Sequence, residues 1–467
     1  MVHTIFREYD IRGKIDSELK IDQVYDLARA IAFYFVTNNP QCKMVAVGMD
    51  GRTHSPLIKE HLCRALTDSG FNVVFIGTCT SPVLYFALNT MSVDAGIMIT
   101  ASHNPKEYNG FKISLGTQSV WGKEILKIRD LYQAKKRVES TTTGTITECD
   151  VITPYIEWFA QNFKHLIGMP LSAVIDCGNG AAGTVIPKLV ERMGWGHMQL
   201  LYADVDGTYP NHEADPVKEE NMLDVRAALR SSDAQVGIGL DGDADRMAPM
   251  TKDGYLVPGD KLLAIFSKQV LKDHPHCGVV MDIKSSAGLI ELLNTWHAKP
   301  YLSPSGHSII KKNMKEHNAI LGGELSCHFF FADRYFGYDD GVYAMMRLFE
   351  ILTDSHQSLA QLLEDFPHKI SSDEFRIACA EDKKGEIVDS AKAFFAARTD
   401  ATMITIDGVR ATMPYGWGII RASNTQPVLS LRFESGTVAG LHQVKQDFVQ
   451  ALRPYFAADV VWQLIGE

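Results

Sequence analysis

Two segments near the ends of the chain carry apolar residues at helical spacing. Residues three and four apart lie on the same face of a helix, so this spacing predicts two helices that each bury one face. The first set is Val24, Leu27, Ala28, Ile31 and Phe35, and the second is Val438, Leu441, Val444, Phe448 and Leu452.

Short apolar runs between such segments predict buried strands, and strands alternating with helices are typical of an α/β protein. Three of these strands run into a loop with an aspartate: "VAVGMDGRTHS" from Val45, "AVIDCGNGAAG" from Ala173 and "VVMDIKSSAG" from Val279. Each is followed by a second strand that ends in a polar loop: "TASHNP" after Ile99, "DGDADR" after Leu240 and "GGELSCH" after Leu321. A pair of strand–loop units used three times predicts three related α/β domains. Strand–loop units occur in any α/β protein, so the unusual chemistry of the second loops is what supports the repeat.

Changes in composition along the chain place the domain boundaries. A polar stretch rich in Ser, Thr and Gly at 138–148 is typical of a linker, and further boundaries are expected near 252–260 and 366–375. The segment beyond the last boundary has strands and helices without the paired loops. We therefore predict α/β domains at 1–145, 146–254 and 255–368, and a smaller, different domain at 369–467.

Composition and charge narrow the class of protein. The chain has 467 residues, too many for one core, with the hydrophobic and charged content of an ordinary globular protein. Its net charge of −10 argues against a nucleic-acid-binding surface. Anionic small substrates stay open, because they need only local arginines and lysines.

The sequence also bears on location. The longest apolar run, near 30–36, is shorter than the roughly 18 residues of a membrane span, and the charged N-terminus is unlike a signal peptide. Eight scattered cysteines without a CxxC pair predict reduced thiols in the cytoplasm. The oligomeric state, monomer or dimer, is not readable from the sequence.

The loop "LDGDADR" is a candidate metal site. Asp241, Asp243 and Asp245 alternate, so an extended backbone can direct all three carboxylates to one point. Carboxylates are hard oxygen ligands suited to Mg²⁺, Mn²⁺ or Ca²⁺. An EF-hand is excluded, because Arg246 and Lys252 stand where its loop needs glycine and glutamate. The alternative is a solvated acidic turn, but closely spaced carboxylates repel one another unless a cation lies among them.

The loop "TASHNP" sets Ser102 and His103 directly behind an apolar strand. Three carboxylates leave room on a metal for a phosphate oxygen, which Ser102 would supply if it were phosphorylated. His103 and Lys112 would then handle protons and charge. Taken alone, the loop is better explained as a plain turn, since its residues are good turn formers. The GxSxG signature of a serine hydrolase is absent around Ser102.

Two more groups of polar residues lie in loops beside apolar strands. "RASNTQP" combines a guanidinium with hydroxyls and an amide, which suits a phosphate dianion: Arg421, Ser423, Asn424 and Thr425. "SPSGHS" contains His307, and "GELSCH" contains Glu324, Ser326 and His328, whose alternation directs them to one side, as reading sugar hydroxyls requires. A polar strand edge explains the last three equally well.

Together these motifs resemble those of the α-D-phosphohexomutase superfamily. "TASHNP" resembles its phosphoserine loop, "DGDADR" its metal loop, "GELSCH" its sugar loop and "RASNTQP" its phosphate loop. Their order and spacing match over essentially the whole chain, including "FREYDIRG" at the start. "YNGFK" and "RASNTQP" are most similar to the phosphomannomutase/phosphoglucomutase branch. The resemblance implies three related α/β domains with mixed sheets and a smaller C-terminal α+β phosphate-binding domain, arranged around a central cleft.

The resemblance also implies roles for individual residues. Ser102 would carry a phosphoryl group and share Mg²⁺ with Asp241, Asp243 and Asp245, and Arg246 would lie near the transferred group. Lys112 and His103 would handle protons. The remaining residues would line the cleft, contact the sugar or hold the unreactive phosphate: Tyr9, Arg12, Lys112 and Lys284; His307, Glu324, Ser326 and His328; Arg421, Ser423, Asn424 and Thr425.

The implied activity is a mutase that interconverts hexose 1-phosphate and hexose 6-phosphate, of mannose or glucose, through a phosphoserine. Glucose 1,6-bisphosphate, or mannose 1,6-bisphosphate, would be its intermediate and activator, and no nucleic acid or membrane partner is expected. Two alternatives stay open: a phosphoglucosamine or strictly glucose-specific mutase, and a non-catalytic sugar-phosphate-binding relative. Cys327 stands where the family usually has glycine, which leaves the sugar preference less defined than the reaction type.

Overall fold

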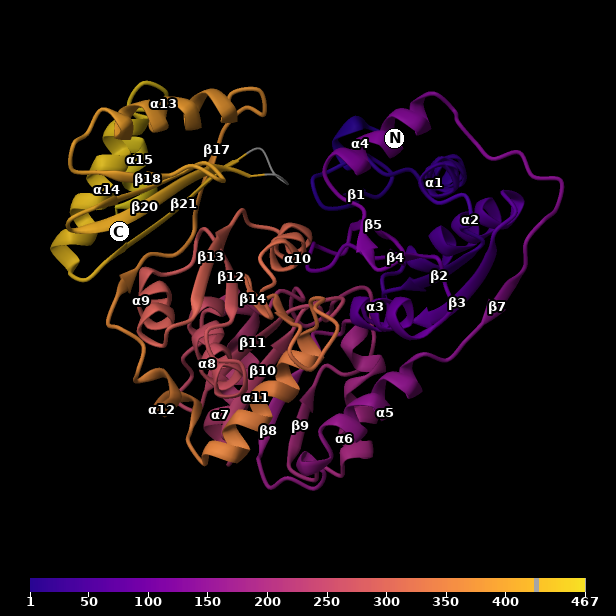
Figure 1. The fold of residues 1–467 in the computed structure, drawn as a ribbon, viewed down its shortest axis with the longest axis horizontal. Coiled ribbons are helices and arrows are strands. Elements are labelled where there is room, and N and C mark those ends of the chain that lie inside the picture. The colour runs from indigo at the N-terminus through magenta and orange to yellow at the C-terminus, as the bar shows by residue number, and fades with distance from the viewer. Residues whose placement is uncertain (424–427, 467) are drawn as a thin grey trace. The chain divides into compact units, whose positions relative to one another are not determined.

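A computed structural model describes residues 1–423 and 428–466 of the chain (Figure 1). The chain divides into two compact units. The first unit comprises Met1–Gly259 and Ser326–Leu363, and the second comprises Asp260–Leu325 and Glu364–Glu467. The segment expected as a third domain, 255–368, therefore contributes to both units. The three boundaries drawn from composition, and the central cleft, stay predictions.

The first sheet of the first unit is mixed, with strand order β1-β5-β4-β2-β3-β7 and β6 beside β5. β2 is parallel to β3 and β4, whereas β5 is antiparallel to β4 and β1. The strands are β1 (Ile11–Lys14), β2 (Met44–Met49), β3 (Asn72–Thr78), β4 (Ala95–Ile99), β5 (Tyr108–Leu115), β6 (Gln118–Ser119) and β7 (Ile146–Glu148). The helices are α1 (Val24–Asn38), α2 (Ser55–Asp68), α3 (Ser81–Thr90) and α4 (Lys123–Gln133).

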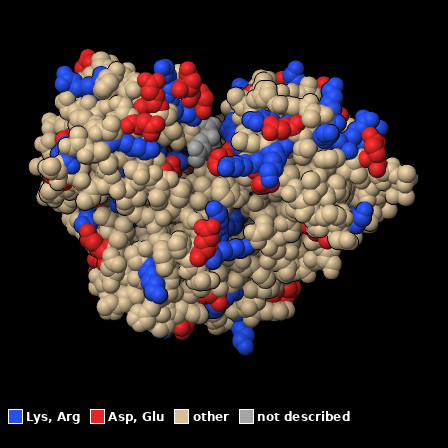
Figure 2. Space-filling view, turned by 45° about the horizontal axis from the view of Figure 1, so that its top comes forward, with Lys and Arg blue, Asp and Glu red and all other residues tan. Residues whose placement is uncertain are grey.

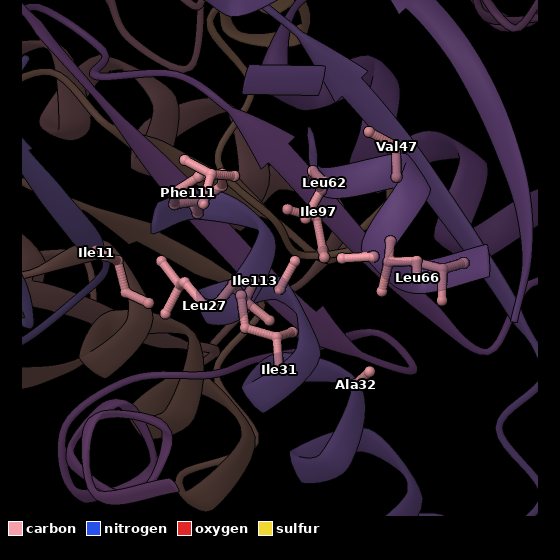
Figure 3. Packing of buried hydrophobic residues seen from close by; sticks show 14 of the residues in the cluster. Ile11, Leu27, Ile31, Ala32, Val47, Leu62, Leu66, Ile97, Phe111 and Ile113 are labelled. Carbon is pink, nitrogen blue, oxygen red and sulfur yellow. The ribbon is translucent and has the colours of Figure 1, made fainter. Parts of the chain in front are cut away.

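Helices cover both faces of this sheet. On one face, apolar residues of α1, α2 and the strands form one core cluster, part of which is labelled in Figure 3. All five residues of the first predicted helical face are wholly buried in α1, which confirms that prediction. On the other face, α3 packs against Gly96, where an added Cβ would lie 3.1 Å from two methyl carbons of Leu88. Because successive strand residues point to opposite faces, Ile97 then faces the core cluster.

The second sheet of the first unit has the order β11-β10-β8-β9. Its strands are β8 (Ala173–Asp176), β9 (Met198–Leu201), β10 (Val236–Leu240) and β11 (Met247–Thr251). The further elements of this unit are β15 (Phe329–Phe331) and the helices α5 (Ile152–Asn162), α6 (Ile186–Met193), α7 (Leu223–Ser231), α11 (Gly341–Ser355) and α12 (Leu359–Leu363).

The second unit contains a parallel arrangement of β13, β12 and β14 and a separate antiparallel sheet. The first has β12 (Gly278–Asp282), β13 (Lys299–Ser303) and β14 (Leu321–Gly323), with α8 (Gly259–Asp273), α9 (Ala287–Thr295) and α10 (His307–Glu316). The antiparallel sheet has the order β16-β21-β20-β19-β18, with β17 also beside β21. Its elements are β16 (Ile370–Ser371), β17 (Phe375–Ala378), β18 (Thr402–Ile404), β19 (Val409–Met413), β20 (Gly416–Ala422), β21 (Val428–Ser435), α13 (Lys384–Ala396), α14 (Val438–Leu452) and α15 (Ala458–Ile465).

The internal repeat predicted from the sequence is present in the sheets. In each copy the two predicted strands lie side by side and parallel: β2 with β4, β8 with β10, and β12 with β14. The next strand of each copy, β3, β9 or β13, pairs on the other side of the first. Adjacent parallel strands end at the same edge of a sheet, so the aspartate loop and the polar loop of each copy emerge together.

The second predicted helical face is confirmed only in part. Val444, Phe448 and Leu452 are wholly buried in α14 and Leu441 is half-buried, but Val438 is 72% exposed. Val438 is the first residue of α14, directly after the N-cap Thr437, and lies before the packed part of the helix.

The structure bears on three further expectations from the sequence: on membrane-spanning helices, on the cysteines and on surface charge. No helix formed by the described residues combines the length and apolar character that a membrane crossing requires. All eight cysteines carry free thiols. Positive and negative side chains are interspersed over the face drawn in Figure 2, so charge on that face is not of one sign. The cytoplasmic location and the absence of a nucleic-acid partner stay predictions.

Candidate active site

Ser102 sits in a strained turn directly after β4. It is 4% exposed, its backbone φ is 50°, and its N–H donates to Thr100 Oγ1 at 2.9 Å. A non-glycine residue in this left-handed region carries about 1–2 kcal/mol of strain. Such strain persists where the surroundings fix the backbone, as at functional sites. The apolar strand and the polar turn behind it therefore present one serine in a fixed orientation.

Arg52, which is not among the residues predicted from the sequence, fixes this turn. Its guanidinium is buried and donates to the backbone carbonyls of Ser102 (2.8 Å), Asn104 (2.6 Å), Pro105 (2.7 Å) and Tyr108 (3.0 Å). A fifth bond, from Nε to Asp50 Oδ2 at 3.1 Å, holds the side chain itself. The signal for Arg52 in the sequence was its position in "MDGR", the aspartate loop at the end of β2. Because β2 and β4 are parallel neighbours, this loop emerges at the same edge of the sheet as the serine loop after β4.

The loop after β10 brings its three aspartates to the same place. Asp241, Asp243 and Asp245 are wholly buried. Ser102 Oγ donates to Asp241 Oδ2 at 2.8 Å, and Arg246 Nε donates to the same oxygen at 3.1 Å. Lys112 Nζ on β5 donates to Asp243 Oδ2 at 2.6 Å and to Asp245 Oδ2 at 2.5 Å. The serine loop, the lysine and the acidic loop thus form one cluster.

A glycine allows the two loops to approach each other. A Cβ added to Gly242 would lie 2.4 Å from the carbonyl oxygen of Ser102 and 3.3 Å from Tyr209 Oη. Any larger residue at this position would have to move the backbone of the serine turn. The glycine between the first two aspartates is therefore required for contact between the loops.

The acidic cluster fits a hard divalent cation. Ligand atoms of the three aspartates lie within 4.8 Å of one another. Asp243 Oδ1 and Asp245 Oδ1 are buried and, among the described residues, have no hydrogen-bond partner. Lys112 pairs with Asp243 and Asp245, and Arg246 is shared between Asp241 and Asp215, so these carboxylates outnumber the cations that pair with them. Burial and the neighbouring Asp245 raise the pKa of Asp241.

Arg246 is buried between two carboxylates. Besides Asp241 it pairs through Nη1 with Asp215 Oδ1 at 3.1 Å, and its Nη2 has no hydrogen-bond partner among the described residues. Burial lowers the pKa of Arg246, but Asp215 and Asp241 raise it further, so the net shift is upward and the group stays charged. Sequence reasoning missed Asp215, whose only signal was the polar stretch "NHEADP" before a helix.

His103 and Lys112, the two predicted proton handlers, have opposite pKa shifts. His103 Nδ1 lies 3.1 Å from Ser102 Oγ. Burial and the positive charges of Arg246 and Arg12 hold the pKa of His103 well below its usual range. For Lys112, burial lowers the pKa, but Asp243 and Asp245 raise it well above its usual range. At neutral pH the imidazole is thus neutral and the lysine is charged.

His328 and Arg12 border the same cluster. Residues Arg246 and His328 form an antiparallel bridge, which brings His328 Nδ1 to 3.7 Å from Asp245 Oδ1 and 3.4 Å from Asp339 Oδ2. Arg12 donates to Asn104 Oδ1 at 2.7 Å and so contacts the serine turn. Asp339, missed in the sequence, was readable only as one of two aspartates before α11.

The remaining predicted residues of the first unit are Tyr9 and Ser326. Both are half-buried, Tyr9 before β1 and Ser326 before β15. Glu324 belongs to the second unit, whereas Ser326 and His328 belong to the first. That the three face one side stays a prediction.

A second group of predicted residues gathers within the second unit. Glu324 Oε1 accepts the N–H of Gly306, directly before the buried His307, at 2.6 Å. Asp407 accepts from the backbone N–H of Ser305 at 3.2 Å and from Arg421 Nε at 2.9 Å. The loop before α10 is therefore joined to Glu324 on one side and, through Asp407, to Arg421 on the other. Asp407 was missed, because "IDGVR" has the form of an ordinary turn.

Lys284 and Ser423 are held by neighbours in the same unit. Lys284 pairs with Glu374 at 2.9 Å and lies 3.9 Å from Asp282. The backbone carbonyl of Ser423 accepts from Lys384 Nζ at 2.6 Å. Asn424 and Thr425, the other two residues predicted to hold a phosphate, lie outside the described residues.

Family models match the chain along nearly its whole length. Models described as phosphoglucomutase/phosphomannomutase α/β/α domains I, II and III and C-terminal domain match residues 3–139, 153–254, 258–370 and 374–451 in turn. The chain belongs to the phosphoglucomutase/phosphomannomutase family. This confirms the resemblance and the fold class, three α/β domains with mixed sheets followed by a smaller C-terminal domain.

Individual relatives agree with the family models. The chain is 38% identical over 450 residues to a phosphomannomutase/phosphoglucomutase of Pseudomonas aeruginosa, covering 96% of each protein. It is 39% identical over 447 residues to a phosphoglucomutase of Neisseria gonorrhoeae, covering 95% of each. A solved phosphoglucomutase/phosphomannomutase family protein from Burkholderia thailandensis has a TM-score of 0.89 at 34% identity, covering 97% of this chain and 98% of its own. The chain is a hexose-phosphate mutase, an isomerase.

Proposed function

We propose that this mutase interconverts the 1-phosphates and 6-phosphates of both mannose and glucose, with Ser102 as the group that carries phosphate. The observation that carries the proposal is the hydrogen bond of 2.8 Å from Ser102 Oγ to Asp241, inside a wholly buried acidic cluster. The names of the Pseudomonas and Neisseria relatives supply the two sugars. The alternatives, a glucosamine-specific or glucose-specific mutase or a silent relative, differ from it in which sugar phosphates are turned over and in whether the protein gains a phosphate.

The proposed transfer begins from phosphorylated Ser102. The bond between Ser102 Oγ and phosphorus breaks while a bond forms between phosphorus and the free hydroxyl oxygen of the sugar, which gives a hexose 1,6-bisphosphate. The sugar hydroxyl loses its proton, and Ser102 Oγ leaves with the electron pair and takes up one proton. In the second half the bisphosphate returns its other phosphoryl group to Ser102, so atoms and charge balance over the cycle.

The pKa shifts divide the work between the two candidate proton handlers. We assign the role of proton acceptor to His103, because its imidazole is neutral and its Nδ1 lies 3.1 Å from Ser102 Oγ. Lys112 stays protonated between Asp243 and Asp245 and acts as a fixed positive charge. Arg246 has a buried Nη2 that can meet a phosphate oxygen.

Asp241, Asp243 and Asp245, together with an oxygen of phosphorylated Ser102, would hold Mg²⁺. When bound, Mg²⁺ withdraws charge from the phosphoryl group. Mg²⁺ rather than Mn²⁺ is part of the proposal, since carboxylate oxygens suit both ions.

The residues of the second unit are proposed to bind the parts of the sugar phosphate that do not react. Arg421, Ser423, Asn424 and Thr425 would hold the second phosphate, and His307 and Glu324 would contact sugar hydroxyls, as would Ser326 and His328 of the first unit. The link from Arg421 through Asp407 to the loop before His307 supports a common binding role for these residues. Tyr9, Arg12 and Lys284 would line the path of the substrate, in a protein that we place in the cytoplasm.

The test compares wild type with Ser102→Ala on mannose 1-phosphate and on glucose 1-phosphate, with Mg²⁺ and a trace of glucose 1,6-bisphosphate. We expect turnover of both sugars by wild type and loss of both in the variant. Intact-mass measurement after incubation with the bisphosphate should show one added phosphate in wild type only. Turnover that survives in Ser102→Ala would remove the phosphoserine mechanism, and turnover of one sugar would narrow the specificity. A wild-type protein without turnover or added phosphate would be the silent relative.

A further inference from the structure

Asp243 is held by a serine that lies 162 positions earlier in the chain. Ser81 is the first residue of α3 and is wholly buried. Its Oγ donates to Asp243 Oδ2 at 2.5 Å, and its backbone N–H donates to the backbone carbonyl of Asp243 at 3.0 Å. The first turn of α3 thus holds both the side chain and the backbone of one member of the acidic cluster.

Two donors on one oxygen decide which oxygen of the carboxylate faces the centre of the cluster. Ser81 Oγ and Lys112 Nζ both donate to Asp243 Oδ2, while Oδ1 is buried with no hydrogen-bond partner among the described residues. Rotation about the Cβ–Cγ bond would exchange the two oxygens. Lys112 alone resists this rotation weakly, because its ammonium also binds Asp245 and can move toward it. Ser81 is fixed by its second, backbone bond to Asp243.

We propose that Ser81 is a positioning residue of the metal site, which orients Asp243 so that Oδ1 receives the cation. The inference rests on the proposed function, since it takes Asp241, Asp243 and Asp245 as the cation ligands. Outer residues that orient a metal ligand typically change metal affinity by 10–100-fold. A serine followed by proline at a helix start, "SPVLY", has an ordinary structural reason in the sequence and gave no sign of this role.

The chain offers a closely matched control. Ser55 is the first residue of α2, is followed by proline as Ser81 is, and is wholly buried. Its Oγ also donates to a buried aspartate, Asp50 Oδ1, at 2.8 Å, but Asp50 is not in the acidic cluster. Ser55→Ala therefore removes the same kind of bond from a carboxylate that is not a proposed cation ligand. Because Asp50 also holds Arg52 and through it the Ser102 turn, this variant is the control for Mn²⁺ binding and not for activity.

The experiment measures binding of Mn²⁺ alone, by the electron paramagnetic resonance signal of the free ion, to the full chain. We expect Ser81→Ala to weaken binding about 10-fold and Ser55→Ala to leave it within about two-fold of wild type. In the mutase assay, the activity that Ser81→Ala loses should return as Mg²⁺ is raised, with the KM for glucose 1-phosphate unchanged. A change of packing alone would not be reversed by Mg²⁺.

The outcomes separate the inference from the function on which it rests. Equal Mn²⁺ affinity in Ser81→Ala and wild type would overturn the role of Ser81, as would a loss of activity that saturating Mg²⁺ does not restore. If Asp243→Asn also binds Mn²⁺ as tightly as wild type, the metal site itself is wrong, whatever Ser81 does.

Discussion

Ser102 and Cys327 are among the residues around the acidic cluster that have left-handed backbones, with φ of 50° and 68°. Both are nearly buried, at 4% and 2% exposed. The backbone carbonyl of Cys327 accepts the N–H of Met247 at 3.2 Å, which joins the loop of His328 to β11. Glycine would suit such a φ, and the side chain of Cys327 is accommodated only with backbone strain.

The strain at Cys327 predicts an unusual order of stability. We expect Cys327→Gly to have a melting temperature no lower than that of Cys327→Ala. Glycine removes about 1–2 kcal/mol of backbone strain from the folded state. The greater freedom of glycine in the unfolded chain destabilises the fold relative to alanine by only roughly 0.4–1 kcal/mol. Cys63 lies equally buried within α2, and there glycine should be the less stable by about 1 kcal/mol. If the glycine variant unfolds at a lower temperature than the alanine variant at both positions, the strain at Cys327 is contradicted.

Arg52 provides a second prediction for a single residue. Arg52→Lys keeps the charge but cannot reach four carbonyls and Asp50 at once, because an ammonium has three donors on one atom. We expect the rate of phosphoryl uptake by Ser102 to fall about 100-fold, the usual effect of a displacement near 1 Å at a reacting group. Arg64→Lys, on the exposed side of α2, is the control. Phosphorylation at the wild-type rate in Arg52→Lys would show that the turn holds its shape without Arg52.

At the scale of elements, the contact between two loops depends on one glycine. Gly242→Ala places a Cβ 2.4 Å from the Ser102 carbonyl, so the serine turn and the acidic loop have to separate. We expect mutase activity to fall at least about 100-fold while the protein still folds. Gly196→Ala, where an added Cβ has no atom within 4 Å, should keep wild-type activity. Comparable activities of the two variants would mean that the loops tolerate separation.

An ion pair between two loops of the second unit, the loop after β12 and the loop between β16 and β17, predicts a pH dependence. Burial raises the pKa of Glu374, but Lys284 and a hydrogen bond from Ser430 lower it more, to about 2. Because the pKa of Glu374 is lower in the folded chain than its ordinary value of 4.5, the ionised carboxylate stabilises the fold above pH 4.5, and this stabilisation is lost as pH falls toward 2. Its size is on the order of 3 kcal/mol.

The measurement is the thermal midpoint of wild type and of Glu374→Gln across this pH range. The gap between the two should be largest near neutral pH and should close between pH 4.5 and pH 2. Glu316→Gln, on an exposed part of α10, should give a small gap that hardly varies. A gap that persists at pH 2 would mean that Glu374 contributes by packing and not by its charge.

For the whole molecule, the division into two units predicts where a cation acts. The proposed Mg²⁺ ligands all lie in the first unit. A ligand at 100 times its Kd stabilises the structure that binds it by about 2.7 kcal/mol. We therefore expect Mg²⁺ without sugar phosphate to slow amide hydrogen exchange at residues 100–104 and 240–246, and to leave strands β19–β21 of the second unit unchanged. Equal slowing in both units would argue that the cation site is not confined to the acidic loop.

The sequence by itself determined the local parts of this protein. Helical spacing predicted α1, and the exposed Val438 is the one misplaced residue of the α14 pattern, since spacing does not say where packing against a helix begins. The repeated strand–loop pairs predicted three related sheet arrangements. Asp241, Asp243 and Asp245 were readable as a set because they are neighbours along the chain and their carboxylates repel.

Only the tertiary structure decided which distant groups complete the site. Four contacts between separate segments of the chain complete the site. They join Arg52 to Ser102, Asp215 to Arg246, Ser81 to Asp243 and Asp407 to Arg421. Their residue types occur throughout the chain with ordinary structural roles, so type and spacing do not distinguish them. A hydrogen bond needs atoms within about 3 Å, and that distance between residues far apart in the chain is fixed only when strands and helices pack.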